Sequence, residues 1–259
     1  MILGFGFVIA LAAAARSTWS PCGLSMLSQI TPMAEAGRQQ KFARTASWFV
    51  AGAVLGGVTL GAAIAGGAIA LDAAGIGHNT ALALTAGAAF IAAAVDAKLF
   101  GFGPPFLTRQ VNEAWLSKYR AWVYGGGFGW QIGAGVTTYV MTAAVPLMIV
   151  VGALSTNAWG ALAIGALFGL ARGLAVLLGA RLHTPAALLA FHRRFDAWGE
   201  PVGRAVIGVQ LAVAAIGAWI VAPIIVASGV SVAAVVLFAW TRGDLHSGRH
   251  EIEPAPERS

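Results

Sequence analysis

The sequence predicts an all-α, polytopic membrane protein. Apolar residues make up 58% of the 259-residue chain and charged residues 10%, whereas soluble domains carry about 25% charge. Mean hydropathy is +0.78, and apolar runs long enough for a membrane helix recur along the chain. In this setting the net charge of +6 indicates membrane orientation and lipid headgroup contact. We therefore expect the lipid bilayer as a partner and no nucleic acid.

The first apolar segment, from about Ile2 to Met33, is too long for one plain span. Proline removes a backbone donor and clashes with the preceding turn, so Pro21 interrupts this helix. Ser20 suits the N-cap of a restarting half-helix, and Pro21 suits its first position. The sequence thus predicts a first helix broken at proline.

Further spans are expected over residues 45–71, 79–99, 127–154 and 158–182, and from about residue 202 onward. The apolar stretch from Ala205 to Trp240 leaves two alternatives: one long helix bent at Pro223, or two short spans turning at Ser228-Gly229. We expect six spans, with seven as the alternative. The charged, proline-containing residues 241–259 form a tail that we expect to be disordered.

Basic residues set the expected topology. Lys and Arg occur in the connections after the first, third and fifth spans, and none occurs in those after the second and fourth. Positive residues favour the cytoplasmic side, so the three basic connections are expected there. The sequence therefore predicts a multi-pass protein of the inner (plasma) membrane.

A short internal repeat relates the two halves of the chain. Gly52-Ala53-Val54-Leu55-Gly56 recurs as Gly165-Ala166-Leu167-Phe168-Gly169. Three spans followed by three spans give the halves opposite orientations, as in inverted-repeat membrane proteins. We expect a transmembrane domain over residues 1–240, with repeats 1–100 and 125–240 joined by a polar connection, residues 100–124. In such proteins the site lies near the midplane, where interrupted helices meet.

Ser20-Pro21-Cys22 with the following Leu24, a proline-ended helix and a basic connection resembles the opening of the DsbD/CcdA transmembrane family. The resemblance implies six core helices in inverted halves. It also implies electron transfer from cytoplasmic thioredoxin to extracytoplasmic thiols, often for cytochrome c maturation. The family's second cysteine would fall near residues 136–138, where this chain has Val-Thr-Thr. The resemblance therefore implies thiol exchange at Cys22 with another molecule, either a thioredoxin-like or a cytochrome-assembly protein.

Cys22 is the candidate catalytic residue and the chain's single cysteine. In the first turn of a restarting helix, the positive end of the helix dipole favours a reactive thiolate, whereas burial in lipid opposes it. The alternative is a small, buried, apolar residue, which is a common fate of free cysteine.

Polar residues within the spans supply the other candidates. Arg16 and Arg172 would each cost about 3 kcal/mol or more in lipid, so we expect them to face a cavity that holds an anion or a thiolate. For Arg16 the alternative is the membrane interface. Asp96 and Lys98 are expected to form an interfacial pair. The remaining candidates for a pocket or helix break are Pro21, Gln131, Thr137, Thr138 and Tyr139, for which the alternative is interhelical hydrogen bonding.

Two main function classes follow. The first is a thiol-disulfide oxidoreductase-like protein of cytochrome c biogenesis acting through Cys22. The second is a small-solute or metal-ion transporter on the same inverted-repeat scaffold. A non-catalytic assembly subunit is a third. We expect no resident metal site and no cofactor.

Overall fold

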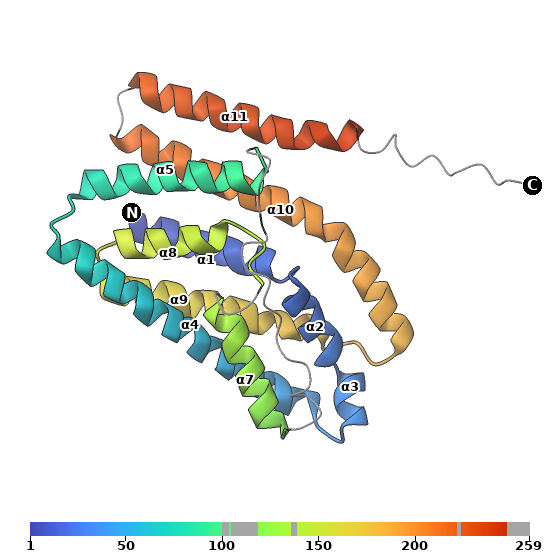
Figure 1. The fold of residues 1–259 in the computed structure, drawn as a ribbon. Coiled ribbons are helices and arrows are strands. Elements are labelled where there is room, and N and C mark those ends of the chain that lie inside the picture. Colours follow the sequence, from blue (N-terminus) through green and yellow to red (C-terminus); the bar gives the residue numbers. More distant parts are fainter. Residues whose placement is uncertain (100–103, 105–118, 136–138, 222–223, 248–259) are drawn as a thin grey trace, which may run out of the picture.

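The computed structural model describes residues 1–99, 104, 119–135, 139–221 and 224–247, which form a bundle of helices (Figure 1). This confirms the expected all-α class. The helices are α1 (Ile2–Ser17), α2 (Pro21–Gln29), α3 (Pro32–Gly37), α4 (Phe42–Ala73), α5 (His78–Asp96), α7 (Ala121–Ala134), α8 (Ala144–Leu154), α9 (Ala158–Leu174), the short 3₁₀ helix η1 (Ala175–Gly179), α10 (Pro185–Val221) and α11 (Ile224–Ser247).

The predicted break in the first helix is confirmed. Helices α1 and α2 meet at an angle of 67°. Ser20 is the N-cap of α2, and its hydroxyl accepts a hydrogen bond from the Gly23 backbone N–H at 3.2 Å. Pro21 occupies the first turn, where its missing N–H costs nothing. A Cβ atom at Gly23 would lie 2.1 Å from the Thr18 carbonyl oxygen, so only glycine permits this tight bend.

Four helical segments are long and apolar enough to cross a membrane: α4, α5, α9 continued through η1, and α10. If α1 and α2 together form one bent span, the described residues contain five candidates. This number falls short of the six spans that the sequence predicts. The shorter apolar helix α8 and residues Gly229–Ala239 of α11 do not reach the same length.

The expected fourth span, residues 127–154, is wrong as a single helix. Helix α7 ends at Ala134, and α8 begins only at Ala144. Gly135 adopts a φ of +68°, a conformation that glycine tolerates and that stops an α-helix. Residues 136–138, which include Thr137 and Thr138, lie outside the described part of the chain.

The C-terminal apolar stretch forms two helices. Helix α10 ends at Val221 and α11 begins at Ile224, and the two run side by side (Figure 1). The alternative turn at Ser228-Gly229 is therefore wrong, because both residues lie inside α11. Pro223 and residues 248–259 lie outside the described residues.

Helix α4 packs closely against α7 and α9 because its glycines allow both helices to approach its backbone. Gly52 and Gly56 face α7, and a Cβ atom at either would lie 2.1 Å from a backbone oxygen of Gly126 or Trp130. Gly57 faces α9, where its Cβ would lie 2.3 Å from the Gly165 carbonyl oxygen. Small residues of this kind allow backbone contact between membrane helices. The repeated glycine segments thus pack α4 directly against α9.

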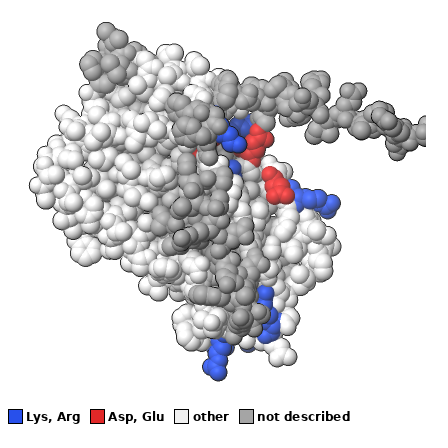
Figure 2. Space-filling model, viewed as in Figure 1, with Lys and Arg blue, Asp and Glu red and all other residues white. Residues whose placement is uncertain are grey.

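The surface of the bundle carries many exposed apolar side chains, including Leu55, Ile69 and Ile91, each about 60% exposed. Figure 2 shows a broad face without Lys, Arg, Asp or Glu, while the charged side chains gather toward one side and the lower end. Extended apolar surfaces of this kind mark contact with a membrane or partner. The surface therefore fits contact with a lipid bilayer.

Candidate functional site

The break between α1 and α2 and the break between α7 and α8 meet at Arg172, in the last turn of α9. Its side chain is buried, with 3% of the residue exposed. One guanidinium nitrogen, Nη1, donates to the Ile132 carbonyl at 2.8 Å, and Nη2 donates to the Ser17 carbonyl at 3.3 Å. Ser17 ends α1 and Ile132 lies in the last turn of α7. One cation therefore joins two helix ends far apart in the sequence.

This arrangement has a simple electrostatic basis. The last carbonyls of a helix lack intrahelical partners and form the negative end of its dipole. Arg172 donates to carbonyls at two such ends, which also accept the backbone N–H groups of Ser20 and Gly135. Its planar, forked donor group suits this bridging. Its guanidinium carbon also lies 5.7 Å from the centre of the Phe168 ring. The protein's own carbonyl groups thus solvate the buried arginine. The sequence had instead suggested that Arg172 faces a cavity that holds an anion or a thiolate.

Cys22 lies next to this bridge, close enough to interact electrostatically with Arg172. It is 2% exposed and belongs to a hydrophobic cluster with Met26, Phe49 and Ile132. Tyr139 packs against the same cluster and is partly buried. The structure therefore brings the predicted candidates Pro21, Cys22, Tyr139 and Arg172 to one place. Gln131 lies on α7 beside Ile132 and is partly buried, whereas Thr137 and Thr138 lie outside the described residues.

Helix α10 covers the outside of the α1–α2 break with aromatic side chains. Trp19 stacks on Phe195, with ring centroids 4.3 Å apart, and its indole N–H donates to the Phe195 carbonyl at 2.7 Å. On α2, Ser28 lies within hydrogen-bond distance of His192, at 3.1 Å. These contacts fix the bend between α1 and α2 from a third helix.

A second polar centre surrounds Asp96 at the end of α5. Its carboxylate accepts hydrogen bonds from the Thr142 hydroxyl at 2.6 Å, the Ala143 N–H at 2.7 Å and the Gln210 amide at 2.9 Å. Arg16 also interacts with Asp96 electrostatically. The expected Asp96–Lys98 pair is therefore wrong, because three donors from other segments hold the carboxylate. The Oε1 atom of the fully buried Gln210 has no hydrogen-bond partner among the described residues.

Arg16 faces a cavity beside this centre. The cavity has a volume of about 150 Å³ and is lined by Arg16, Asp96, Lys98, Pro104, Met141, Thr142, Gly203 and Ile207. Arg16 is partly buried at the end of α1. Of the two arginines that the sequence singled out, Arg16 thus lies at a cavity, whereas Arg172 is enclosed by protein.

A third polar centre, around Glu35, ties α3 to α4 and α7. The Glu35 side chain is fully buried, and Arg38 donates to its Oε1 at 2.9 Å. Its Oε2 accepts hydrogen bonds from the hydroxyls of Thr45 and Tyr124. Arg38 also donates to the Gln29 carbonyl at 2.8 Å, which connects α2 to this centre. A buried carboxylate with this many donors is well satisfied and acts as a structural anchor.

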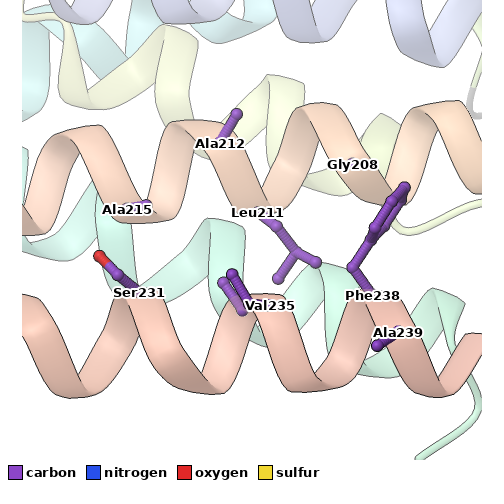
Figure 3. Close-up of a pocket in the computed structure, with 9 residues that line it drawn as sticks. Gly208, Leu211, Ala212, Ala215, Ser231, Val235, Phe238 and Ala239 are labelled. Atoms are coloured by element: carbon purple, nitrogen blue, oxygen red, sulfur yellow. The ribbon is translucent and has the colours of Figure 1, made fainter.

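An apolar groove runs between α10 and α11, with a volume of about 590 Å³. Figure 3 shows Leu211 and Phe238 projecting into the space between the two helices. Phe238 rests against Gly208, where an added Cβ would lie 3.3 Å from its ring. The lining is almost wholly apolar, with Ser231 as the polar exception, so this groove offers hydrophobic contact.

Sequence reasoning did not include Asp96, Gln210 and Glu35 among the site residues. For Asp96 and Gln210, a carboxylate or amide inside an apolar stretch is the signal that could have drawn attention to them. Among the described residues, no group of three or more His, Cys, Asp or Glu side chains is placed to hold a metal ion. The hydrogen-bonding sites above are accordingly built from arginine, carboxylate, hydroxyl and amide groups.

Comparisons with known proteins give one consistent result. The chain is 32% identical over 177 residues to the methylamine utilization protein MauF of Paracoccus denitrificans, an alignment that covers 66% of this chain and 62% of that protein. It is 33% identical over 162 residues to MauF of Methylobacillus flagellatus, covering 58% of this chain and 52% of that protein. MauF of Paracoccus versutus is 29% identical over 181 residues, covering 68% and 64%.

The chain thus aligns with less than two thirds of the length of these curated relatives. No protein-family model and no solved structure matches the chain.

These relatives correct two expectations from the sequence. The resemblance to the DsbD/CcdA family is wrong, because the curated relatives are MauF proteins, which are not members of that family. The function inferred from that resemblance, thiol exchange in cytochrome c biogenesis, is wrong for the same reason. The small-solute or metal-ion transporter finds no support in these relatives either. The misleading signal was Ser20-Pro21-Cys22, a motif that the break between α1 and α2 accounts for structurally. The chain is similar to MauF over about two thirds of its length.

Proposed function

We propose that this chain is a multi-pass protein of the plasma membrane that serves methylamine utilization. The observation that carries this proposal is its similarity to four proteins named for that process, over 162 to 181 aligned residues. The apolar surface and the candidate membrane spans support the location. The basic connections after α3 and α5 support placing those ends of the bundle in the cytoplasm.

In this proposal the functional core is the junction of the two interrupted helix pairs, α1–α2 and α7–α8. An interruption in each half supports an inverted-repeat arrangement, since such proteins place their centre where broken helices meet. Arg172 is the residue that holds the junction together, through the carbonyls of Ser17 and Ile132. Cys22 and Tyr139 line the same junction.

The role we assign to Cys22 is packing beside Arg172. It is 2% exposed and surrounded by apolar side chains, so its size and polarity matter more than a reaction at its sulfur. Cys22→Ala keeps a small apolar side chain in this space. We expect that variant to retain function, whereas Cys22→Trp, which cannot fit, should lose it.

Complementation tests the proposed function. A strain of Paracoccus denitrificans that lacks MauF would receive this chain, MauF itself as the positive control, or an empty vector. We expect this chain to restore growth on methylamine as sole carbon source, with equal growth of all strains on succinate. The Cys22→Ala and Cys22→Trp variants follow in the same assay. If a chain shown by immunoblot to be in the membrane restores no growth on methylamine, the proposal is wrong.

A further inference from the structure

The cavity beside Asp96 has an unbalanced charge. Two cations, Arg16 and Lys98, and one carboxylate, Asp96, line it. The carboxylate oxygens already accept hydrogen bonds from Thr142, the Ala143 N–H and Gln210. Within the described ranges, neither cation forms an ion pair with a carboxylate. Among the described residues, the cavity lining therefore carries one positive charge in excess.

The excess positive charge of the lining favours an anionic ligand over a cationic one. A small cation, including an alkylammonium ion, would meet two positive groups and a carboxylate that already accepts three hydrogen bonds. An anion would meet the cationic groups of Arg16 and Lys98, which form no ion pair with a carboxylate among the described residues. Charged hydrogen bonds to such an anion are among the stronger polar contacts in proteins, and arginine suits oxyanions in particular.

The volume of the cavity further limits which anions can bind. The cavity holds about 150 Å³, which is comparable to the engineered lysozyme cavity that accommodates one benzene ring of six heavy atoms. A phosphate group has five heavy atoms and fits this space. A singly charged phosphate also balances the one excess positive charge. Gly203 packs beside the Arg16 side chain, since a Cβ atom built there would lie in van der Waals contact with the guanidinium, 3.4 Å from its Nε atom.

We propose that this cavity binds a singly charged phosphate group, held by Arg16 and Lys98. The group is either free inorganic phosphate or the phosphodiester of a lipid headgroup, because both present the same oxyanion to the two cations. This site is separate from the Arg172 junction, and the proposal stands independently of methylamine utilization.

Thermal unfolding of the purified full chain in dodecyl maltoside, a phosphate-free detergent, tests the proposal. One arm adds inorganic phosphate at constant ionic strength, and the other adds phosphatidylglycerol to the micelles without inorganic phosphate. A ligand that binds only the folded state raises Tm in a saturable way. A rise in the first arm alone identifies free phosphate, and a rise in the second alone identifies a headgroup.

Variants separate the site from general charge effects. Lys98 is exposed and lines the cavity, so Lys98→Gln should fold normally. The apparent affinity of this variant for phosphate should fall about tenfold, because one charged contact is lost. Ile207→Phe fills the cavity while keeping both cations, and should also weaken the response. Arg44→Gln removes an exposed cation on α4 that does not line the cavity, and should leave the response unchanged.

Two results would overturn the proposal. One is no saturable rise in Tm with either phosphate source. The other is a rise that Lys98→Gln and Ile207→Phe leave as strong as in the unmodified chain, since the ligand would then lie elsewhere.

Discussion

Arg172 shows how the protein accommodates a full charge among apolar side chains. A charge in this position is tolerated when donors find acceptors, and backbone carbonyls at two helix ends provide them. The same principle explains Glu35, whose carboxylate is fully buried and receives hydrogen bonds from Arg38, Thr45 and Tyr124. At both positions a polar group organises the helices around it.

Replacing Arg172 by lysine should destabilise the protein although the charge is kept. Lysine has a compact, strongly hydrated ammonium group and cannot span the Ile132 and Ser17 carbonyls as the planar guanidinium does. Each carbonyl also accepts a backbone N–H, so the change removes a hydrogen bond to a charged donor, which is worth about 1.5–3 kcal/mol. We expect Arg172→Lys to lower Tm in detergent by several degrees.

The matched control for Arg172→Lys is Arg181→Lys, at an exposed position just after η1. Surface substitutions of this kind usually change stability by less than about 0.5 kcal/mol. Equal Tm values for the two variants would show that the bridge between the helix ends contributes nothing measurable.

The sequence identified some of these residues and missed others for a physical reason. An arginine in an apolar run stands out in the sequence, so Arg172 and Arg16 could be singled out. The partners of Arg172 are the backbone carbonyls of Ser17 and Ile132, which have no sequence signature. Asp96 lay at the end of an expected span next to Lys98, and only folding shows that its carboxylate turns toward Thr142 and Gln210.

Helix interruptions were predictable where their residues have strong backbone preferences. Ser20 and Pro21 gave the break between α1 and α2 because an N-cap hydroxyl and a first-turn proline act locally. The break after α7 was missed because Gly135 stands among many other glycines in an apolar run. Glycine permits a left-handed φ without requiring it, so tertiary packing selects which glycine ends a helix.

The packing of α4 on α9 gives a prediction with an internal control. A Cβ atom at Gly57 would lie 2.3 Å from the Gly165 carbonyl oxygen, so Gly57→Ala must push the two helices apart. We expect a loss of about 1–3 kcal/mol from this overpacking, seen as a lower Tm.

Gly66→Ala is the control on the same helix, because an added Cβ there meets nothing within 4 Å. Alanine has the higher helix propensity, by about 1 kcal/mol, so this variant should be as stable as the unmodified chain or more so. If both variants behaved alike, close α4–α9 contact would not be what makes Gly57 necessary.

The molecule is a helical bundle with many exposed apolar side chains, and the face shown in Figure 2 has a broad area without charged residues. A water-soluble bundle of this size would expose charged residues all round, since exposed apolar patches promote association. The distribution of Lys and Arg among the connections adds an orientation to this picture.

Cysteine labelling of intact cells tests that orientation. In a Cys22→Ala background, Ala36→Cys at the end of α3 and Ala74→Cys just after α4 place one exposed thiol on each side of α4. The positive-inside rule puts the basic connection near residue 36 in the cytoplasm and the other outside. A membrane-impermeant maleimide should therefore label Ala74→Cys in whole cells and label Ala36→Cys only after lysis. The reverse pattern would invert the proposed topology.

The sequence alone predicted the all-helical class of this protein: its composition and long apolar segments indicate helices compatible with lipid contact, because a helix satisfies its backbone hydrogen bonds internally. It also determined the first helix break, since Ser20 and Pro21 act within one turn. Tertiary structure decided what those elements do together. The bridge from Arg172 to two helix ends and the three donors on Asp96 depend on contacts between distant segments. Such contacts form only when glycine-permitted packing fixes the helices relative to one another.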